Sequence, residues 1–173
     1  MDIRSLELGD GEALVRFISR IPEADRTFFK EDVEASAVID AWTHPGPARA
    51  VAVAAGEIVG YVAVVPLHGW SDHVGEVRLI VDPGHRGRGI GRALARRAVL
   101  EAVALDLRKM VVEVVADQEP TIAMFRALGF DPEALLTDHV RDQSGAVRDL
   151  MILAQSVEAQ WSAMSVAGIS DEL

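Results

Sequence analysis

The sequence predicts an α/β protein with one mixed sheet, in the order β α α β β β α β α β β. Three observations predict this class. Half of the 173 residues are hydrophobic, which suffices for one buried core at this length. Short β-branched runs bounded by turn residues indicate strands. Between them lie segments whose apolar residues recur every three or four positions, as in amphipathic helices.

The first forty residues predict a strand and two helices. The strand covers Ile3 to Leu6, and Asp10 is expected to cap the N-terminus of the first helix. The apolar face of that helix continues to Ile18, and Pro22 marks its end. A second helical pattern covers residues 33–42 and stops at "HPGP".

Three strands and a long helix follow. Residues 48–56 and 57–67 predict a hairpin, and residues 76–82 predict the next strand. Residues 88–105 carry a helical apolar stripe with arginines beside it, and 109–117 is another buried strand. A strand, helix and strand in series predict a crossover between parallel neighbours.

The remaining residues predict a short helix and a closing hairpin. The helix covers 119–128, with Gly129 as its C-terminal cap. Two strands, 135–142 and 146–154, flank the turn "QSG". The predicted sheet therefore ends at residue 154.

Domain organisation follows from the absence of an internal repeat or linker. We expect residues 1–154 to form one domain and residues 155–173 to form a C-terminal helical extension. The extension has an apolar stripe of Val157, Trp161 and Met164, which we expect to dock on the sheet, with a homodimer contact as the second choice.

The cellular compartment is predicted from what the sequence lacks. The N-terminus "MDIRSLELGDGE" does not have the order of a signal peptide, and no apolar run approaches the roughly 20 residues that span a bilayer. We therefore expect a soluble, cytoplasmic protein without membrane contact. The chain has no cysteine, which excludes disulfides and thiolate chemistry.

The charge distribution predicts the kind of partner. A net charge of -10 argues against nucleic acid, which is bound through accumulated positive charge. However, five of the 17 basic residues fall within twelve positions: Arg86, Arg88, Arg92, Arg96 and Arg97. A compact cationic site on an acidic protein suggests a small, highly charged anion.

The segment "DPGHRGRGIGRAL", residues 82–94, is the candidate anion site. It is not a P-loop, because Ile90 and Gly91 follow Gly89 where Lys and Ser or Thr are required, and its glycines do not match the dinucleotide fingerprint. It fits a turn that leads from a strand into a helix N-terminus, whose unpaired N–H groups bind phosphate oxygens. A diphosphate is the predicted ligand. The alternative is a plain tight turn with solubilising arginines.

The same residues carry a family resemblance. Arg86 to Gly91 is similar to the R/Q-x-x-G-x-G/A signature of the GNAT superfamily of N-acetyltransferases, and "FRALGF" (125–130) resembles that family's second motif. The predicted element order also matches, over residues 2–154. The resemblance implies that acetyl-CoA is the donor and that its acetyl group passes directly to an amine. The five histidines show no metal-ligand spacing, so we expect no metal.

The resemblance also implies where CoA binds. The backbone amides of residues 87–92 would hold its pyrophosphate, and the strand segment 79–81 would pair with the pantetheine arm. Many members have an asparagine where this chain has Gln118. Many also have, where this chain has Phe125, a tyrosine that protonates the departing thiolate. The implied cofactor-binding residues are Leu79, Ile80, Val81, Arg86, Gly87, Arg88, Gly89, Ile90, Gly91, Arg92, Gln118 and Phe125.

Two glutamates are candidates for the general base. Glu76 occupies a position similar to the catalytic glutamate of acyl-CoA synthetase-type lysine acetyltransferases and of phosphinothricin acetyltransferases. Glu113 occupies that of the ribosomal-protein N-acetyltransferases, although it could instead pair with Arg78. We rank Glu76 first, and either residue could be an ordinary polar side chain. His139, on a strand that leads to the acceptor site in the family, is a further candidate.

Two functions follow from these residues. The first is an acetyl-CoA-dependent N-acetyltransferase that acts on a primary amine of a small molecule or a protein lysine. The second is a CoA-binding regulator without turnover, which the missing tyrosine supports. A nucleic-acid-binding module is a third interpretation, which the net charge disfavours. The resemblance implies that the acceptor pocket forms from residues 21–35 and the hairpin near "RDQSGAV".

Overall fold

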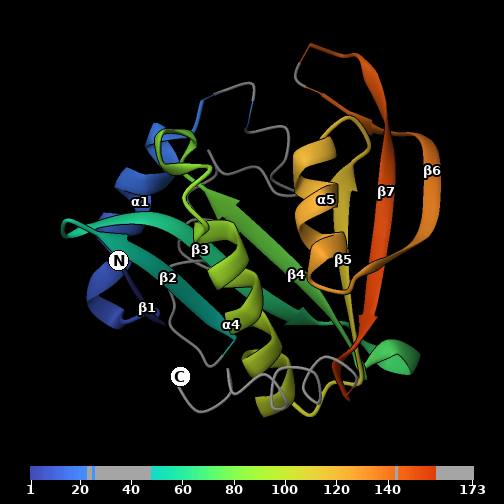
Figure 1. The fold of residues 1–173 in the computed structure, drawn as a ribbon, viewed down its shortest axis with the longest axis horizontal. Coiled ribbons are helices and arrows are strands. Elements are labelled where there is room, and N and C mark those ends of the chain that lie inside the picture. The colour runs from blue at the N-terminus through green and yellow to red at the C-terminus, as the bar shows by residue number, and fades with distance from the viewer. Residues whose placement is uncertain (23–24, 26–47, 143, 159–173) are drawn as a thin grey trace.

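A computed structural model describes residues 1–22, 25, 48–142 and 144–158 (Figure 1). Its strands form one seven-stranded sheet in the order β1-β2-β3-β4-β5-β7-β6. The predicted α/β class is therefore confirmed. The strands are β1 (Asp2–Ser5), β2 (Arg49–Ala54), β3 (Glu57–Pro66), β4 (Val74–Val81), β5 (Lys109–Val115), β6 (Asp131–Arg141) and β7 (Val147–Ser156).

Three α-helices and three 3-10 turns accompany the sheet in the described residues. The helices are α1 (Gly11–Arg20), α4 (Ile90–Ala104) and α5 (Glu119–Ala127). The 3-10 turns are η1 (Leu8–Asp10), η2 (Gly69–Ser71) and η3 (Pro83–His85). The predicted second helix, 33–42, lies outside the described residues, as does the predicted extension from residue 159 onward.

The central feature of the sheet is the pairing of β4 with β5. These strands are parallel, as the crossover predicted, whereas all other neighbours are antiparallel. Their pairing covers three positions and ends at Glu76, opposite Val111. Beyond that point β4 continues to Val81 and β5 to Val115. Figure 1 shows the two strands diverging from their common end.

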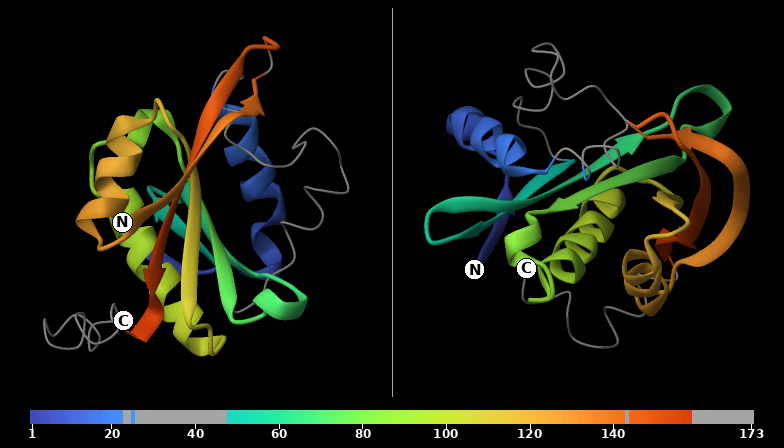
Figure 2. Two further views of the ribbon diagram at one scale, coloured as in Figure 1. Left: turned by 90° about the vertical axis from the view of Figure 1, so that its right-hand side faces the viewer. Right: turned by 90° about the horizontal axis from the view of Figure 1, so that it is seen from above.

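Helices cover both faces of the sheet. Helices α4 and α5 lie on one face and α1 lies on the other (Figure 2). Leu94 of α4 belongs to a core with Val77 of β4 and Val112 of β5, and Phe17 of α1 belongs to a second core with Tyr61 of β3. Because alternate residues of a strand face opposite sides, the neighbours of Val77 face the α1 side.

Asp10 is the N-cap residue of α1, as predicted, but its side chain does not cap the helix. Its carboxylate makes no capping hydrogen bond to α1. It accepts hydrogen bonds from Arg4 at 2.6 and 2.8 Å and from the backbone N–H of Glu7 at 2.8 Å. Asp10 therefore closes the preceding turn η1, because Arg4 of β1 and the Glu7 N–H occupy its carboxylate oxygens.

Other element boundaries also differ from the predicted ones. Helix α4 begins at Ile90 rather than residue 88, because Gly89 has a left-handed φ of 81°. Strand β7 runs through residues 155 and 156, where the sequence predicted the extension, because Gln155 and Ser156 pair with the first residues of β5. The predicted cap at Gly129 is confirmed: its φ is 89°, and its N–H donates to the Arg126 carbonyl at 2.9 Å. None of the described helices has both the length and the apolar character needed to cross a membrane.

Candidate functional site

The β4–α4 loop, residues 82–89, ends at the N-terminus of a fifteen-residue helix. Gly87 and Gly89 have φ values of 75° and 81°, in the region that favours glycine. Within α4, the N–H of Ala93 donates to the Gly89 carbonyl at 3.0 Å. The N–H groups of residues 90–92 therefore have no partner inside the helix, as at any helix start. This geometry suits the oxygens of an anion.

The third glycine of the motif has a different role from the other two. Gly91 is helical, and a Cβ at this position would lie 3.0 Å from the Met124 sulfur of α5. It would also lie 3.8 Å from Val81 Cγ2. A small residue here allows α5 to pack against the first turn of α4. The sequence placed Gly91 with the ligand, and the structure adds a packing reason for it.

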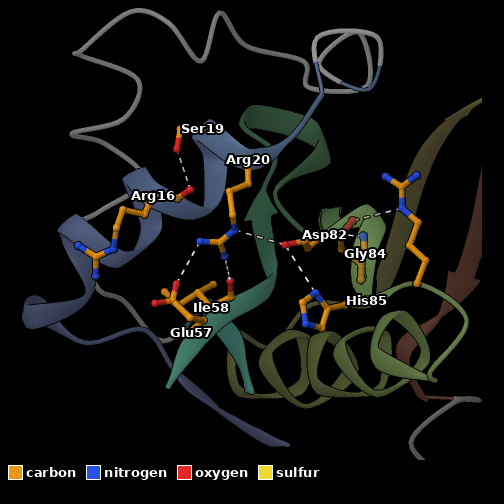
Figure 3. Close-up of polar contacts among 10 residues, drawn as sticks. Arg16, Ser19, Arg20, Glu57, Ile58, Asp82, Gly84 and His85 are labelled. Carbon is orange, nitrogen blue, oxygen red and sulfur yellow. Dashed lines mark hydrogen bonds and ion pairs between the residues drawn. The ribbon is translucent and has the colours of Figure 1, made fainter. Parts of the chain in front are cut away.

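Asp82 anchors the start of this loop. It is buried, and its Oδ1 accepts a hydrogen bond from the Gly84 N–H at 2.9 Å. Its Oδ2 lies 3.4 Å from Arg20 Nε and 3.6 Å from His85 Nδ1 (Figure 3). Asp82 lies in the predicted anion-site segment, but neither it nor Arg20 was predicted to have a role of its own. The signal for Asp82 was present, since an aspartate before proline at a strand end favours this type of turn.

Arg86, the first residue of the signature, points back toward the sheet. Its Nε donates to the Val81 carbonyl at 3.2 Å, and its Nη2 donates to Asp25 Oδ2 at 3.0 Å. The side chain is therefore held by protein groups in this structure. Arg88 and Arg92 are exposed beside the start of α4.

The two predicted base residues are linked through Arg78. Glu76 is 7% exposed, and its Oε1 accepts a hydrogen bond from Arg78 Nε at 3.1 Å. Burial lowers the pKa of Arg78, and the negative charge of Glu113 opposes that shift. All three residues face the α1 side of the sheet, where β4 and β5 part. The structure thus brings both glutamates to one arginine.

The strand segment predicted to pair with pantetheine lies in the diverging part of β4. Leu79 and Val81 pack against the α4 core, and Ile80 packs against the α1 core. Their side chains are thus engaged in packing on both faces. The backbone edge toward β5 is the part of this segment that a ligand between the strands would contact.

Phe125 and the single tyrosine of the chain, Tyr61, are both buried. Phe125 is 1% exposed and packs edge-to-face on Phe130, with ring centroids 5.2 Å apart. Tyr61 lies in the core beneath α1, where burial raises the pKa of its hydroxyl and a hydrogen bond with Arg49 opposes the shift. The predicted contact of Phe125 with CoA stays a prediction.

The other candidate residues lie at the ends of elements or on the surface. Gln118 is the N-cap of α5, and its carbonyl accepts hydrogen bonds from the N–H groups of Thr121 and Ile122. His139 is exposed, at an irregular position between Leu136 and Val140 in the pairing of β6 with β7. In the described part of the chain, no group of three or more His, Asp or Glu side chains is placed to hold a metal.

Comparisons with known proteins identify the family and the fold. Residues 15–130 match the model of the acetyltransferase (GNAT) family. The chain is 27% identical over 135 residues to an uncharacterized N-acetyltransferase, YjgM, of Escherichia coli, and the match covers 75% of this chain and 81% of that protein. It is 37% identical over 81 residues to a streptothricin acetyltransferase of Streptomyces lavendulae, covering 46% of this chain and 42% of that protein. A match to a mycothiol acetyltransferase of Pseudarthrobacter chlorophenolicus, 30% identical, covers 51% of this chain and only 28% of that protein.

Solved structures share the fold. The putative acetyltransferase yncA of Salmonella typhimurium, solved with its cofactor acetyl-CoA, has a TM-score of 0.73 at 20% identity and covers 91% of this chain and 94% of its own. A GNAT superfamily phosphinothricin acetyltransferase of Sinorhizobium meliloti, in complex with AcCoA, has a TM-score of 0.72 at 22% identity, with 90% and 87% covered.

Proposed function

Because the chain belongs to the acetyltransferase (GNAT) family, we propose that it transfers the acetyl group of acetyl-CoA directly to a primary amine of a small molecule or of a protein lysine. The observation that carries the proposal is the geometry of β4. Its pairing with β5 ends at Glu76, and its other end leads into a glycine-rich turn and a helix N-terminus. One strand thus joins a candidate base to a candidate anion site.

The donor would lie along the diverging part of β4. Its pyrophosphate would accept hydrogen bonds from the N–H groups of the β4–α4 loop and the first turn of α4, with Arg88 and Arg92 nearby. Its pantetheine arm would run along the backbone of residues 79–81 toward Glu76. The two structural neighbours named with acetyl-CoA support this donor.

The chemistry needs two proton movements. Glu76 would accept a proton from the ammonium group of the acceptor, directly or through water. The amine nitrogen then attacks the thioester carbonyl carbon, the C–S bond breaks and CoA leaves as a thiolate, while the nitrogen releases its second proton to water as the amide forms. Phe125 has no proton to donate, so the thiolate would take its proton from water.

The charges around Glu76 favour a cationic acceptor. Glu76 and Glu113 contribute two negative charges and Arg78 one positive charge, and the whole chain has a net charge of -10. This sign complements an ammonium group. The relatives named for mycothiol, streptothricin and phosphinothricin make amines of these kinds the first acceptors to test.

The proposal is tested with purified protein, acetyl-CoA and a panel of amines that includes a lysine peptide. We expect at least one amine to cause release of CoA thiol, measured with a thiol-reactive dye, and to gain an acetyl group by mass spectrometry. The chain has no cysteine, so the dye reports CoA alone. CoA binding without thiol release across the panel would contradict the proposal and favour a regulator.

A further inference from the structure

Arg20, the last residue of α1, contacts three groups outside its own helix. Its Nη1 donates to Glu57 Oε2 at 3.0 Å, and its Nη2 donates to the Ile58 carbonyl at 2.7 Å, both on β3. Its Nε donates to Asp82 Oδ2 at 3.4 Å, at the start of the β4–α4 loop (Figure 3). The planar guanidinium suits this arrangement because it presents several donors in fixed directions. Helix α1 is thereby joined to the loop that precedes α4.

Asp82 transmits this contact to the backbone of the loop. Its side chain is 13% exposed, and its two oxygens have different partners. While Oδ2 faces Arg20, Oδ1 accepts the Gly84 N–H at 2.9 Å and so fixes turn η3. Without Arg20 the carboxylate would lose a cationic partner in a mostly buried place, which is costly. We expect it to rotate toward solvent or toward His85, 3.6 Å away, and to release Gly84.

A second ion pair joins the same loop to the chain after α1. Arg86 Nη2 lies 3.0 Å from Asp25 Oδ2, and Arg86 Nε lies 3.2 Å from the Val81 carbonyl. Both Asp82 and Arg86 thus contact residues at or just beyond the end of α1. These contacts bracket η3, which directs the chain toward Gly87 and Gly89.

We propose that Arg20 is a positioning residue for the donor: through Asp82 it holds the β4–α4 loop in the conformation that binds the pyrophosphate of acetyl-CoA. This inference rests on the proposed function for the identity of the ligand. Arg20 acts through the loop and not on the reacting atoms. Its loss therefore weakens donor binding and leaves the chemical step at saturating donor unchanged.

Helix α1 itself offers a matched control. Arg16, one turn earlier, is 57% exposed and pairs with Glu12 of the same helix at 3.7 Å. Its replacement removes the same charge from the same helix without touching the contacts of Asp82. Comparing Arg20→Met with Arg16→Met therefore separates the loop contact from the general effect of charge on CoA binding.

The experiment measures the Kd of CoA by calorimetry, and the KM for acetyl-CoA and kcat by thiol release. We expect Arg20→Met to raise both the Kd and the KM roughly tenfold, the loss typical of a hydrogen bond to a charged group. We expect kcat to stay within about twofold. Arg20→Lys should give intermediate values of Kd and KM, since an ammonium group cannot make all three contacts of the guanidinium. Arg16→Met should have the same Kd, KM and kcat as the parent protein.

Asp82→Asn tests the relay. It should weaken CoA binding as Arg20→Met does, and the double variant should be no weaker than either single one, because both changes break one connection. Circular dichroism and thermal melts verify folding, and Arg20→Lys replaces Arg20→Met if the latter unfolds. An unchanged CoA Kd in a folded Arg20 variant, or a loss of kcat with unchanged KM, would overturn the inference. CoA binding that depends on Arg20 without acetylation of any amine would refute the proposed function and leave this inference standing.

Discussion

Glu76 combines two properties that single it out among the carboxylates of the sheet. It is the last β4 residue paired with β5, and it accepts a hydrogen bond from Arg78. Glu113 lies two positions beyond the last paired residue of β5, on the diverging part of that strand. These positions agree with ranking Glu76 first as the base, and the ranking itself stays a prediction.

We predict that Glu76→Gln lowers kcat about 100-fold or more and flattens the pH dependence, because an amide keeps the shape and cannot accept the proton. Both effects are measured from initial rates at a series of pH values, with the amine that the screen identifies as the acceptor. Glu12→Gln, at a side chain 94% exposed on α1, is the control. A larger loss in Glu113→Gln would move the role of base to Glu113.

Asp10 is a structural residue with a pH-dependent contribution. The hydrogen bond from Arg4 lowers the pKa of Asp10 below its ordinary value of 3.8, and the Glu7 N–H adds to the effect. A lowered folded-state pKa means that the stabilisation is present above the unfolded value and is lost as pH falls through the folded one.

Asp10→Asn should therefore lower the free energy of unfolding by about 1–3 kcal/mol at pH 7. The difference from the parent protein should shrink at pH values below the folded pKa of Asp10, since the parent carboxylate is then protonated too. Urea unfolding across this pH range measures the free energy of unfolding of the parent protein and of the variant. An equal difference at every pH would show that charge is not the cause.

At the scale of elements, the β4–α4 loop depends on backbone conformation more than on side chains. Gly89, the N-cap of α4, has a φ of 81°, and a Cβ there would meet no atom within 4 Å. Any penalty for a side chain at this position would therefore come from the backbone conformation and not from a clash.

We predict that Gly89→Ala lowers the free energy of unfolding by about 1–2 kcal/mol and weakens CoA binding, because the left-handed conformation disfavours a Cβ. Thermal melts and calorimetry measure the two effects. Gly9, in η1, has equal space and no left-handed φ, so Gly9→Ala is the matched control. Equal losses of stability and of CoA binding in Gly89→Ala and Gly9→Ala would show that the left-handed backbone of Gly89 is not the cause.

Elements with strong periodicity were predicted well, and their ends were not. The apolar stripe of α4 and the buried run of β5 lie where their spacing indicated. Asp10 is the N-cap residue of α1, as expected, but its carboxylate caps the start of η1 and not α1. Periodicity reports which face is buried, whereas an end depends on which of several nearby partners a polar group finds.

At the scale of the whole molecule, the sheet consists of two parts joined at one short stretch. Strands β1 to β4 form one part and β5, β7 and β6 the other, and three residue pairs connect them. The core beneath α4 also spans both parts, through Val62, Val112 and Leu153. The parting of β4 from β5 is thus a property of the assembled sheet.

This arrangement predicts a local pattern of hydrogen exchange. We expect CoA to slow amide exchange in peptides covering residues 77–92, because ligand contacts would replace missing strand partners there. Peptides covering β2, which is paired on both sides, should not change. Mass spectrometry with and without CoA measures this, and slowing spread evenly over the chain would contradict a site along β4.

The sequence by itself determined the α/β class, the strand and helix order of the described part and the glycine-rich turn before α4. Only the tertiary structure decided that Arg20 contacts Asp82, that Gly91 leaves room for Met124 and that Arg78 interacts with both Glu76 and Glu113. The cytoplasmic location, the homodimer and the C-terminal helical extension stay predictions. Local spacing encodes turns, periods and caps because these depend on neighbours in the chain. Contacts between distant residues depend on strand register and on how helices pack across the sheet, which the whole fold sets.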